Sequence, residues 1–211
     1  GSMPYEFEGE YFVAAPSATI SPTNMNVFYI GVDNPLSISV PGANSKDIVA
    51  TISGAGGTIT KGAKDGEYTV KVTKQETCQI SVKAKMNGKE MDMGTMKFRT
   101  KRIPAPIAMV GKQQGGKINK DILAAQGKLR VEKGDFDFPV SYKIASYKIQ
   151  IIGGGDAKPA TSVKGEAFPA DIIAQIKKAR RGTKVYIEEI TAVGPVGEVQ
   201  VSNKDMIFTI Q

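Results

Sequence analysis

The chain has 211 residues and contains no histidine, no tryptophan and a single cysteine. The absence of histidine excludes an imidazole base, a Ser-His-Asp or Cys-His arrangement and any histidine metal ligand. Cys78 cannot form an intramolecular disulfide. It lies in an alternating Thr-Cys-Gln-Ile-Ser-Val run, which predicts a buried small hydrophobe. We therefore expect a protein that is not an enzyme and holds no metal and no cofactor.

The net charge of +7 is confined to the second half of the chain. Residues 1–100 carry 10 Lys and Arg against 10 Asp and Glu, whereas residues 101–211 carry 18 against 11, which is the whole excess. An excess of positive charge in one region favours a contact with an acidic partner there. The alternative is that the charge serves solubility alone.

The first half of the chain has the alternation and the turn residues of an antiparallel β-protein. Residues 26–42 read Asn-Val-Phe-Tyr-Ile-Gly-Val-Asp-Asn-Pro-Leu-Ser-Ile-Ser-Val-Pro-Gly and predict a strand, a turn and a second strand. Asn87-Gly88, between two alternating runs, is a strong hairpin signal. Strands are expected at residues 5–12, 27–32, 36–40, 47–53, 58–60, 67–73, 77–86 and 94–100. This spacing, without a helix, is typical of an immunoglobulin-like β-sandwich.

The prolines at 104 and 106 mark the expected boundary between two domains. They favour a stiff, extended linker over residues 102–106. We predict a β-sandwich domain over residues 4–101 and a second domain over residues 107–211. Residues 1–3, Gly-Ser-Met, resemble a cloning scar, so the sequence is expected to be an excised fragment.

The second half mixes helices with strands and predicts a small α+β domain, in which two short helices pack on a mainly antiparallel sheet. The first helix is expected over residues 119–127, with Asn119 as N-cap and Gly127 at its end. The second helix is expected over residues 169–182, from Pro169 to Gly182. Strands are expected at residues 128–132, 138–144, 145–152, 184–193, 198–201 and 206–210.

Three other groups of residues give weak signals for chemistry. Gly153-Gly154-Gly155 is followed by a turn and not by a helix N-terminus, so it does not predict a phosphate loop. Glu188 and Glu189 are neighbours on an expected strand, where alternation would place them on opposite faces. Residues 111–117, Gly-Lys-Gln-Gln-Gly-Gly-Lys, are expected to form a basic surface loop.

The densest positive cluster follows the apolar stripe of the second predicted helix. Basic residues at a helix C-terminus complement its dipole, which explains part of the cluster. Nucleic-acid binding would favour interleaved aromatic residues, and only Tyr186 is near. An acidic protein surface is therefore the expected partner. The predicted contact residues are Lys177, Lys178, Arg180, Arg181 and Lys184.

Three segments of the chain resemble the GldM/PorM family of gliding-motility and type IX secretion motor proteins. They are the run at 26–42, the junction Phe-Arg-Thr-Lys-Arg-Ile-Pro-Ala-Pro at 98–106, and Ile-Thr-Ala-Val-Gly-Pro-Val-Gly at 190–197. They occur in the family's order. The chain is thus expected to correspond to the last two periplasmic domains of such a protein.

The resemblance implies the function and the partners. Members are anchored in the inner membrane by an N-terminal helix, absent here, that pairs with a GldL/PorL-type protein. A dimeric periplasmic rod is expected to meet a ring of the GldK/GldN or PorK/PorN type near the outer membrane and to transmit force to it. The resemblance implies a periplasmic homodimer without catalytic residues, small-molecule substrate or nucleic acid.

A second hypothesis is a carbohydrate-binding or adhesin-like β-module of a surface protein. Such modules usually present aromatic platforms to their ligands. The chain has no tryptophan, and aromatic residues make up 7% of it, which disfavours this reading. Affinity capture with the ring proteins, set against a glycan array, separates the two hypotheses.

Overall fold

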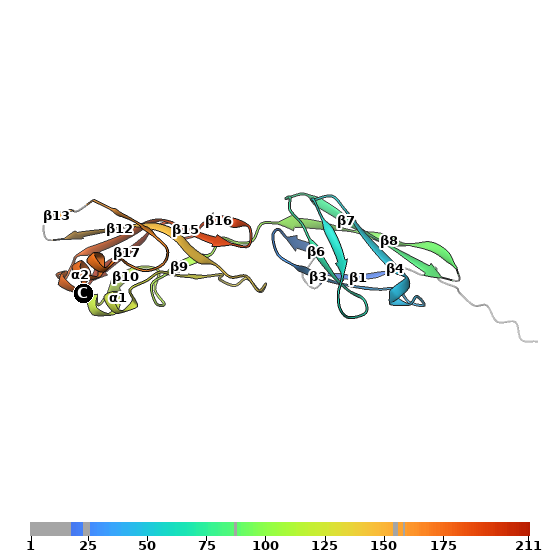
Figure 1. Cartoon of the computed structure of the whole chain (residues 1–211), viewed down its shortest axis with the longest axis horizontal. Coiled ribbons are helices and arrows are strands. Elements are labelled where there is room, and N and C mark those ends of the chain that lie inside the picture. The colour runs from blue at the N-terminus through green and yellow to red at the C-terminus, as the bar shows by residue number, and fades with distance from the viewer. Residues whose placement is uncertain (1–17, 23–25, 87, 154–155, 158) are drawn as a thin grey trace, which may run out of the picture. The chain divides into compact units, whose positions relative to one another are not determined.

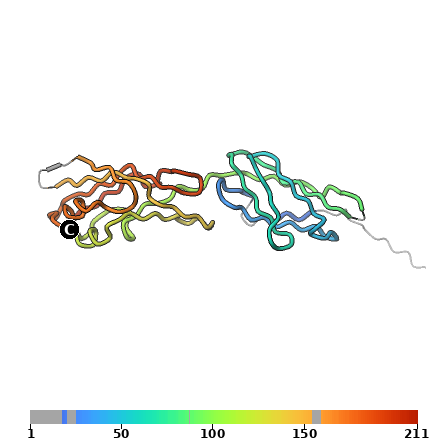
Figure 2. The backbone as a smooth tube through the Cα atoms, in the orientation of Figure 1, coloured from blue at the N-terminus to red at the C-terminus, as the bar shows by residue number. Residues whose placement is uncertain are grey.

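A computed structural model describes residues 18–22, 26–86, 88–153, 156–157 and 159–211. The chain divides into two compact units between Lys101 and Arg102, and the backbone passes from one to the other at this point (Figures 1 and 2). The strand expected at residues 5–12 and the expected scar at residues 1–3 lie outside the described residues.

The first unit consists of two sheets of four described strands each. Neighbouring strands pair antiparallel, except that β2 runs parallel to β8. A 3-10 turn, η1 (Ser45–Asp47), precedes β4. In spatial order, the first sheet contains β1 (Thr19–Pro22), β3 (Asn34–Ser39), β6 (Glu67–Lys71) and β5 (Thr58–Lys61), and the second contains β2 (Val27–Tyr29), β8 (Lys89–Lys101), β7 (Thr77–Met86) and β4 (Ile48–Ser53).

Alternating side chains from both sheets form the core of the first unit. Leu36 and Ile38 of β3 point inward, and so do Cys78 and Ile80 of β7. The rings of Phe28 and Phe98 stack at 4.3 Å between centroids. Burial raises the pKa of the Cys78 thiol, as it disfavours the charged thiolate. The predicted β-sandwich and the predicted burial of Cys78 are both confirmed.

Asn34 joins the two sheets of the first unit. The chain leaves β2 in one sheet, turns at Gly31 with φ +80°, and starts β3 in the other. The Asn34 side chain accepts a hydrogen bond from Tyr29 N–H at 2.7 Å and donates to three carbonyls: Tyr29 at 2.9 Å, Val32 at 3.1 Å and Val70 of β6 at 3.1 Å. The run at 26–42 is therefore an architectural element.

The second unit is built on one large sheet, with seven strands in the described part of the chain. Its pairs are antiparallel apart from β10 and β17. Its central order is β10 (Gly116–Ile118), β17 (Met206–Ile210), β15 (Lys184–Gly194), β12 (Lys143–Gly153) and β13 (Asp156–Ala157), while β14 (Thr161–Lys164) pairs with β12 and β16 (Gly197–Gln200) with β15. A two-stranded sheet joins β9 (Ile107–Met109) to β11 (Arg130–Glu132).

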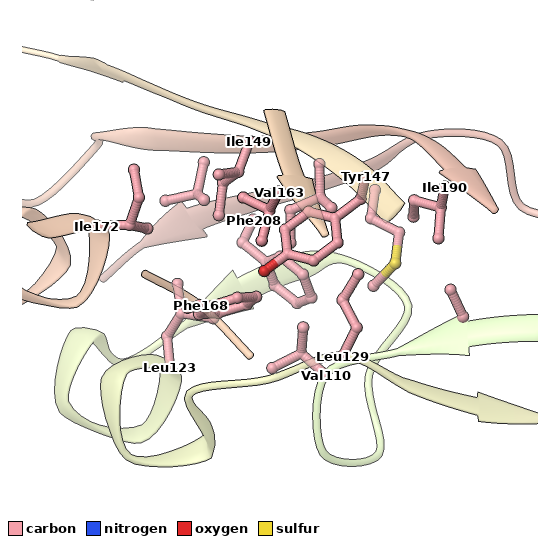
Figure 3. Close-up of a cluster of buried hydrophobic side chains, with 14 of the residues drawn as sticks. Val110, Leu123, Leu129, Tyr147, Ile149, Val163, Phe168, Ile172, Ile190 and Phe208 are labelled. Carbon is pink, nitrogen blue, oxygen red and sulfur yellow. The ribbon is translucent and has the colours of Figure 1, made fainter. Parts of the chain in front are cut away.

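Two helices, α1 (Lys120–Gln126) and α2 (Ala170–Lys178), lie on one side of the large sheet (Figure 1). Asn119 caps α1 by accepting from Asp121 N–H at 2.8 Å, and Gly127 ends it in the left-handed conformation with φ +57°. The core between helices and sheet contains Leu123, Ile172, Ile149 and Phe208 (Figure 3). The α+β prediction for this unit, with two short helices, is confirmed.

Tyr147 of β12 crosses this core (Figure 3). Its ring meets that of Phe168 edge-on at 6.1 Å, and its hydroxyl donates to the carbonyl of Ala167 at 2.8 Å. Burial raises the pKa of the Tyr147 phenol, so the hydroxyl stays protonated and keeps donating. The residue thus fixes the segment before α2 against the sheet.

Candidate partner-binding surface

The five residues predicted to contact a partner lie at the C-terminal end of α2, in the turn that follows, and at the start of β15. All five are exposed. Among the ion pairs of the described residues, none involves any of the five. Their charges are therefore directed to solvent. The cluster, here called the basic end, consists of Lys177, Lys178, Arg180, Arg181 and Lys184.

Helix α2 is held by its apolar stripe, as the sequence predicts. Ile172 and Ile176 are buried against the sheet, while Lys177 and Lys178 in the last turn are exposed. Asp171 in the first turn and the two lysines in the last turn both complement the helix dipole. The helix therefore presents its cations from a fixed position.

Helix α2 ends at Lys178, so the predicted end at Gly182 is wrong. Ala179 is already extended, with φ −61° and ψ 143°. The next residues form a turn in which Thr183 N–H donates to the Arg180 carbonyl at 3.1 Å. Gly182 takes φ +89° and donates its N–H to Ile210 of β17 at 2.8 Å. Because this turn is tied to the sheet, Arg180 and Arg181 project from an anchored loop and not from the helix.

Lys184 starts β15 and points to the face of the sheet opposite the helices. Val185 and Ile187 of the same strand are fully buried, and alternation places Lys184 on the other side. In the register of the sheet, Lys184 and Lys117 of β10 both pair with Thr209 of β17. The structure thus adds Lys117 beside the basic end. Sequence reasoning missed it because residues 111–117 were expected to be a loop.

Two other motifs are placed by the strands around them. Gly153 ends β12 and is followed by β13, so the glycine run precedes a strand and not a helix. Glu188 and Glu189 do not alternate across the sheet as expected. Glu189 has φ +50°, and the buried residues on either side are Ile187 and Ile190. A β-bulge therefore turns both carboxylates outward, and Glu189 pairs with Lys148 at 2.7 Å.

The described residues contain no group of three or more His, Cys, Asp or Glu that could hold a metal ion. None of the helices in the described part of the chain is long and apolar enough to cross a membrane. The candidate surface consists of exposed cations and is suited to recognition of negative charge.

Two family models match the chain. Residues 17–101 match the GldM third domain, and residues 104–211 match the GldM C-terminal domain. The chain belongs to the GldM family. The resemblance of the three segments at 26–42, 98–106 and 190–197 is thereby confirmed. Membership makes this chain part of the gliding and type IX secretion machinery, and the GldM family is a structural motor component.

Solved structures share the β-module type only distantly. Fibronectin(III)-like modules of Clostridium thermocellum CbhA are 13% identical, with 92% of this chain and 94% of that chain covered and a TM-score of 0.30. The D00-D0 domain of intimin is 12% identical, with 93% and 100% covered and a TM-score of 0.33. Similarity at this level has no bearing on the function of the GldM domains. A comparison with curated protein sequences found no match.

Proposed function

We propose that this part of the GldM-family protein is a non-enzymatic periplasmic element that transmits force from the inner-membrane motor to the ring associated with the outer membrane. The observation that carries the proposal is that GldM domain models cover both units, while the second unit presents an exposed basic end.

Long, laterally paired strands make each unit suited to bearing load. β7 and β8 pair from Thr77 to Met86, and β12 and β15 pair over most of their 11 residues each. A force along such a pair is shared by many hydrogen bonds between strands. The sheets therefore resist extension along their strands.

The start of the second unit is also fastened to its sheet. The Asn203 side chain accepts from Ala108 N–H at 2.8 Å and donates to the Ala108 carbonyl at 2.7 Å. Two residues earlier in the chain, the Pro106 carbonyl accepts a hydrogen bond from Ser202 N–H at 2.8 Å. Tension that reaches the second unit through the linker at 102–106 is thus passed by these hydrogen bonds to the connection between β16 and β17.

The basic end provides the contact with the ring. Exposed ion pairs contribute about 0.2–1 kcal/mol each, so several must act together with apolar contacts. Their main effect is on the association rate, which salt lowers. The ring proteins, of GldK/GldN or PorK/PorN type, would offer an acidic face.

We also propose that the protein acts as a homodimer. Sheets of this kind leave strand edges, and a second chain is one way to cover them. The outer edge of β4 and that of β14 have no hydrogen-bonded strand neighbour among the described residues. A twofold assembly would transmit force through two parallel chains.

Affinity capture tests the proposal. The purified chain, immobilised, should retain the GldK/GldN-type ring proteins of the same organism at low salt and release them as the salt concentration rises. The same chain applied to a glycan array should bind no glycan. Glycan binding without capture of the ring proteins would overturn the proposal in favour of a carbohydrate-binding module.

A further inference from the structure

The face of the large sheet opposite the helices carries two aligned rows of exposed and half-buried side chains next to the basic end. In the first row, Lys117, Thr209, Lys184 and Ile152 pair across β10, β17, β15 and β12. In the second row, Ile207, Tyr186 and Gln150 pair across β17, β15 and β12. We call these seven residues the outer rows. Adjacent strands lie about 4.8 Å apart, so four strands give a flat surface about 15 Å wide.

The outer rows have an apolar centre that their own unit leaves uncovered. Ile207 is 44% exposed and Ile152 is 36% exposed, and half-buried Tyr186 lies between their strands. Both helices lie on the other side of the sheet, where the core is (Figure 1). A tyrosine surrounded by apolar contacts that exclude water is the kind of anchor that carries most of the energy at protein interfaces.

The charge on the side of this centre that adjoins the basic end is positive. Lys117 and Lys184 stand in the first row, with Arg180 and Arg181 in the turn beyond it. Neither row contains a carboxylate. The next outward pair beyond the second row is Lys148 with Glu188, and Lys148 forms an ion pair with the neighbouring Glu189. This part of the sheet is therefore apolar at its centre and cationic on the side of the basic end, while Glu188 and Lys148 border its other side.

We propose that the outer rows and the basic end form one docking surface for an acidic protein face, with Tyr186, Ile152 and Ile207 as its apolar anchor. This inference rests on the proposed function. It adds the apolar residues that slow dissociation of the complex after the positive charges have accelerated its association. Lys184 belongs to both parts, which makes the surface continuous. A second copy of this chain is disfavoured as the occupant of this surface. Lys117 and Lys184 of the second copy would repel Lys117 and Lys184 of the first.

The test compares three variants for binding to the immobilised ring proteins, with association and dissociation rates measured at several salt concentrations. The double variant Tyr186→Thr and Ile207→Thr keeps strand-forming residues but removes the anchor. The single variant Ile207→Glu adds a carboxylate at an exposed position, so it stays informative if the double variant does not fold. Val193→Thr is the control, since Val193 is 48% exposed on the same strand as Tyr186 but lies outside the rows.

We expect both anchor variants to dissociate about 10- to 100-fold faster than wild type, since hot-spot losses act on the dissociation rate. The double variant should associate within about twofold of wild type, and Val193→Thr should match wild type in both rates. Unchanged dissociation of the folded anchor variants would overturn the inference and leave the proposed function standing. A wild-type chain that does not bind the ring proteins at all would overturn both. If the anchor variants instead lost self-association in light scattering, the surface would be a contact between copies and the acidic partner would be wrong.

Discussion

Reversing the charge of the basic end should slow association with the ring proteins by about tenfold or more at low salt. The variant changes Lys177, Lys178, Arg180 and Arg181 each to Glu. All four side chains are exposed, and the helix and turn that carry them are anchored through Ile176 and Gly182. The loss should shrink as the salt concentration rises, because salt screens exposed charges. Stopped-flow or surface-based kinetics measure both effects.

A matched control separates a local effect from one of net charge. Lys46, Lys74, Lys85 and Lys97 of the first unit are also exposed, and changing them to Glu alters the net charge by the same amount. This control should associate far faster than the basic-end variant. Circular dichroism should show both variants folded, although Glu at the end of α2 opposes the helix dipole and costs about 0.3–1 kcal/mol per residue. Equal slowing by both variants would show that only overall charge matters.

Asn34→Ala should produce the largest loss of stability of any single polar substitution in the first unit. The change removes four hydrogen bonds to backbone groups and leaves Tyr29 N–H and the Val70 carbonyl without their side-chain partner at the crossing between the sheets. Each buried group left unpaired costs about 1–3 kcal/mol, so a total of about 3 kcal/mol is expected. For a unit of about 100 residues this corresponds to a fall in melting temperature of at least about 10 °C.

Scanning calorimetry of the whole chain measures this effect, with Asn44→Ala as the control. Asn44 is exposed and accepts one hydrogen bond, from Lys46 N–H at 3.2 Å, so its loss should cost under about 1 kcal/mol. Where the two units melt separately, the Asn34 variant should lower one transition only. Equal melting curves for the two variants would contradict the role assigned to Asn34.

Local sequence patterns predicted the helices and strands whose bounds are determined by residues within them. The alternation from Thr77 to Met86 gave β7 with its observed bounds, and the cap residues Asn119 and Gly127 gave α1. Both signals depend on neighbours in sequence, so no tertiary information was needed. The run at 26–42 predicts a strand, a turn and a second strand, but no local pattern specifies the contact from Asn34 to Val70, which joins residues 36 apart.

The errors arose where distant contacts decide the conformation. Residues 138–144 alternate like a strand, yet β12 starts only at Lys143. Phe136 and Phe138 are buried and stack on each other at 5.1 Å, while the Phe138 carbonyl accepts from Lys133 Nζ at 2.9 Å. The segment thus packs as an irregular loop. Similarly, β10 forms because β17 pairs with it, and α2 ends early because the sheet holds Gly182.

The candidate surface was predictable only where it depends on local sequence patterns. The density of Lys and Arg at 177–184 is visible in the sequence, and its exposure follows from the amphipathic pattern of α2. Lys117 and the outer rows depend on the register of four strands, which no local pattern specifies. Lys117 and most of the outer rows are distant in sequence from the basic end, so the sequence does not show that they lie beside it.

Lysine footprinting on the complex tests the central claim, that the second unit meets the ring through its basic end, most directly. The chain is acetylated briefly with and without an excess of the ring proteins, and each lysine is quantified by mass spectrometry. We predict that Lys177, Lys178 and Lys184 are protected in the complex, while exposed Lys74 and Lys97 of the first unit react equally in both samples. Unchanged reactivity of Lys177, Lys178 and Lys184 in a complex that has demonstrably formed would contradict the account.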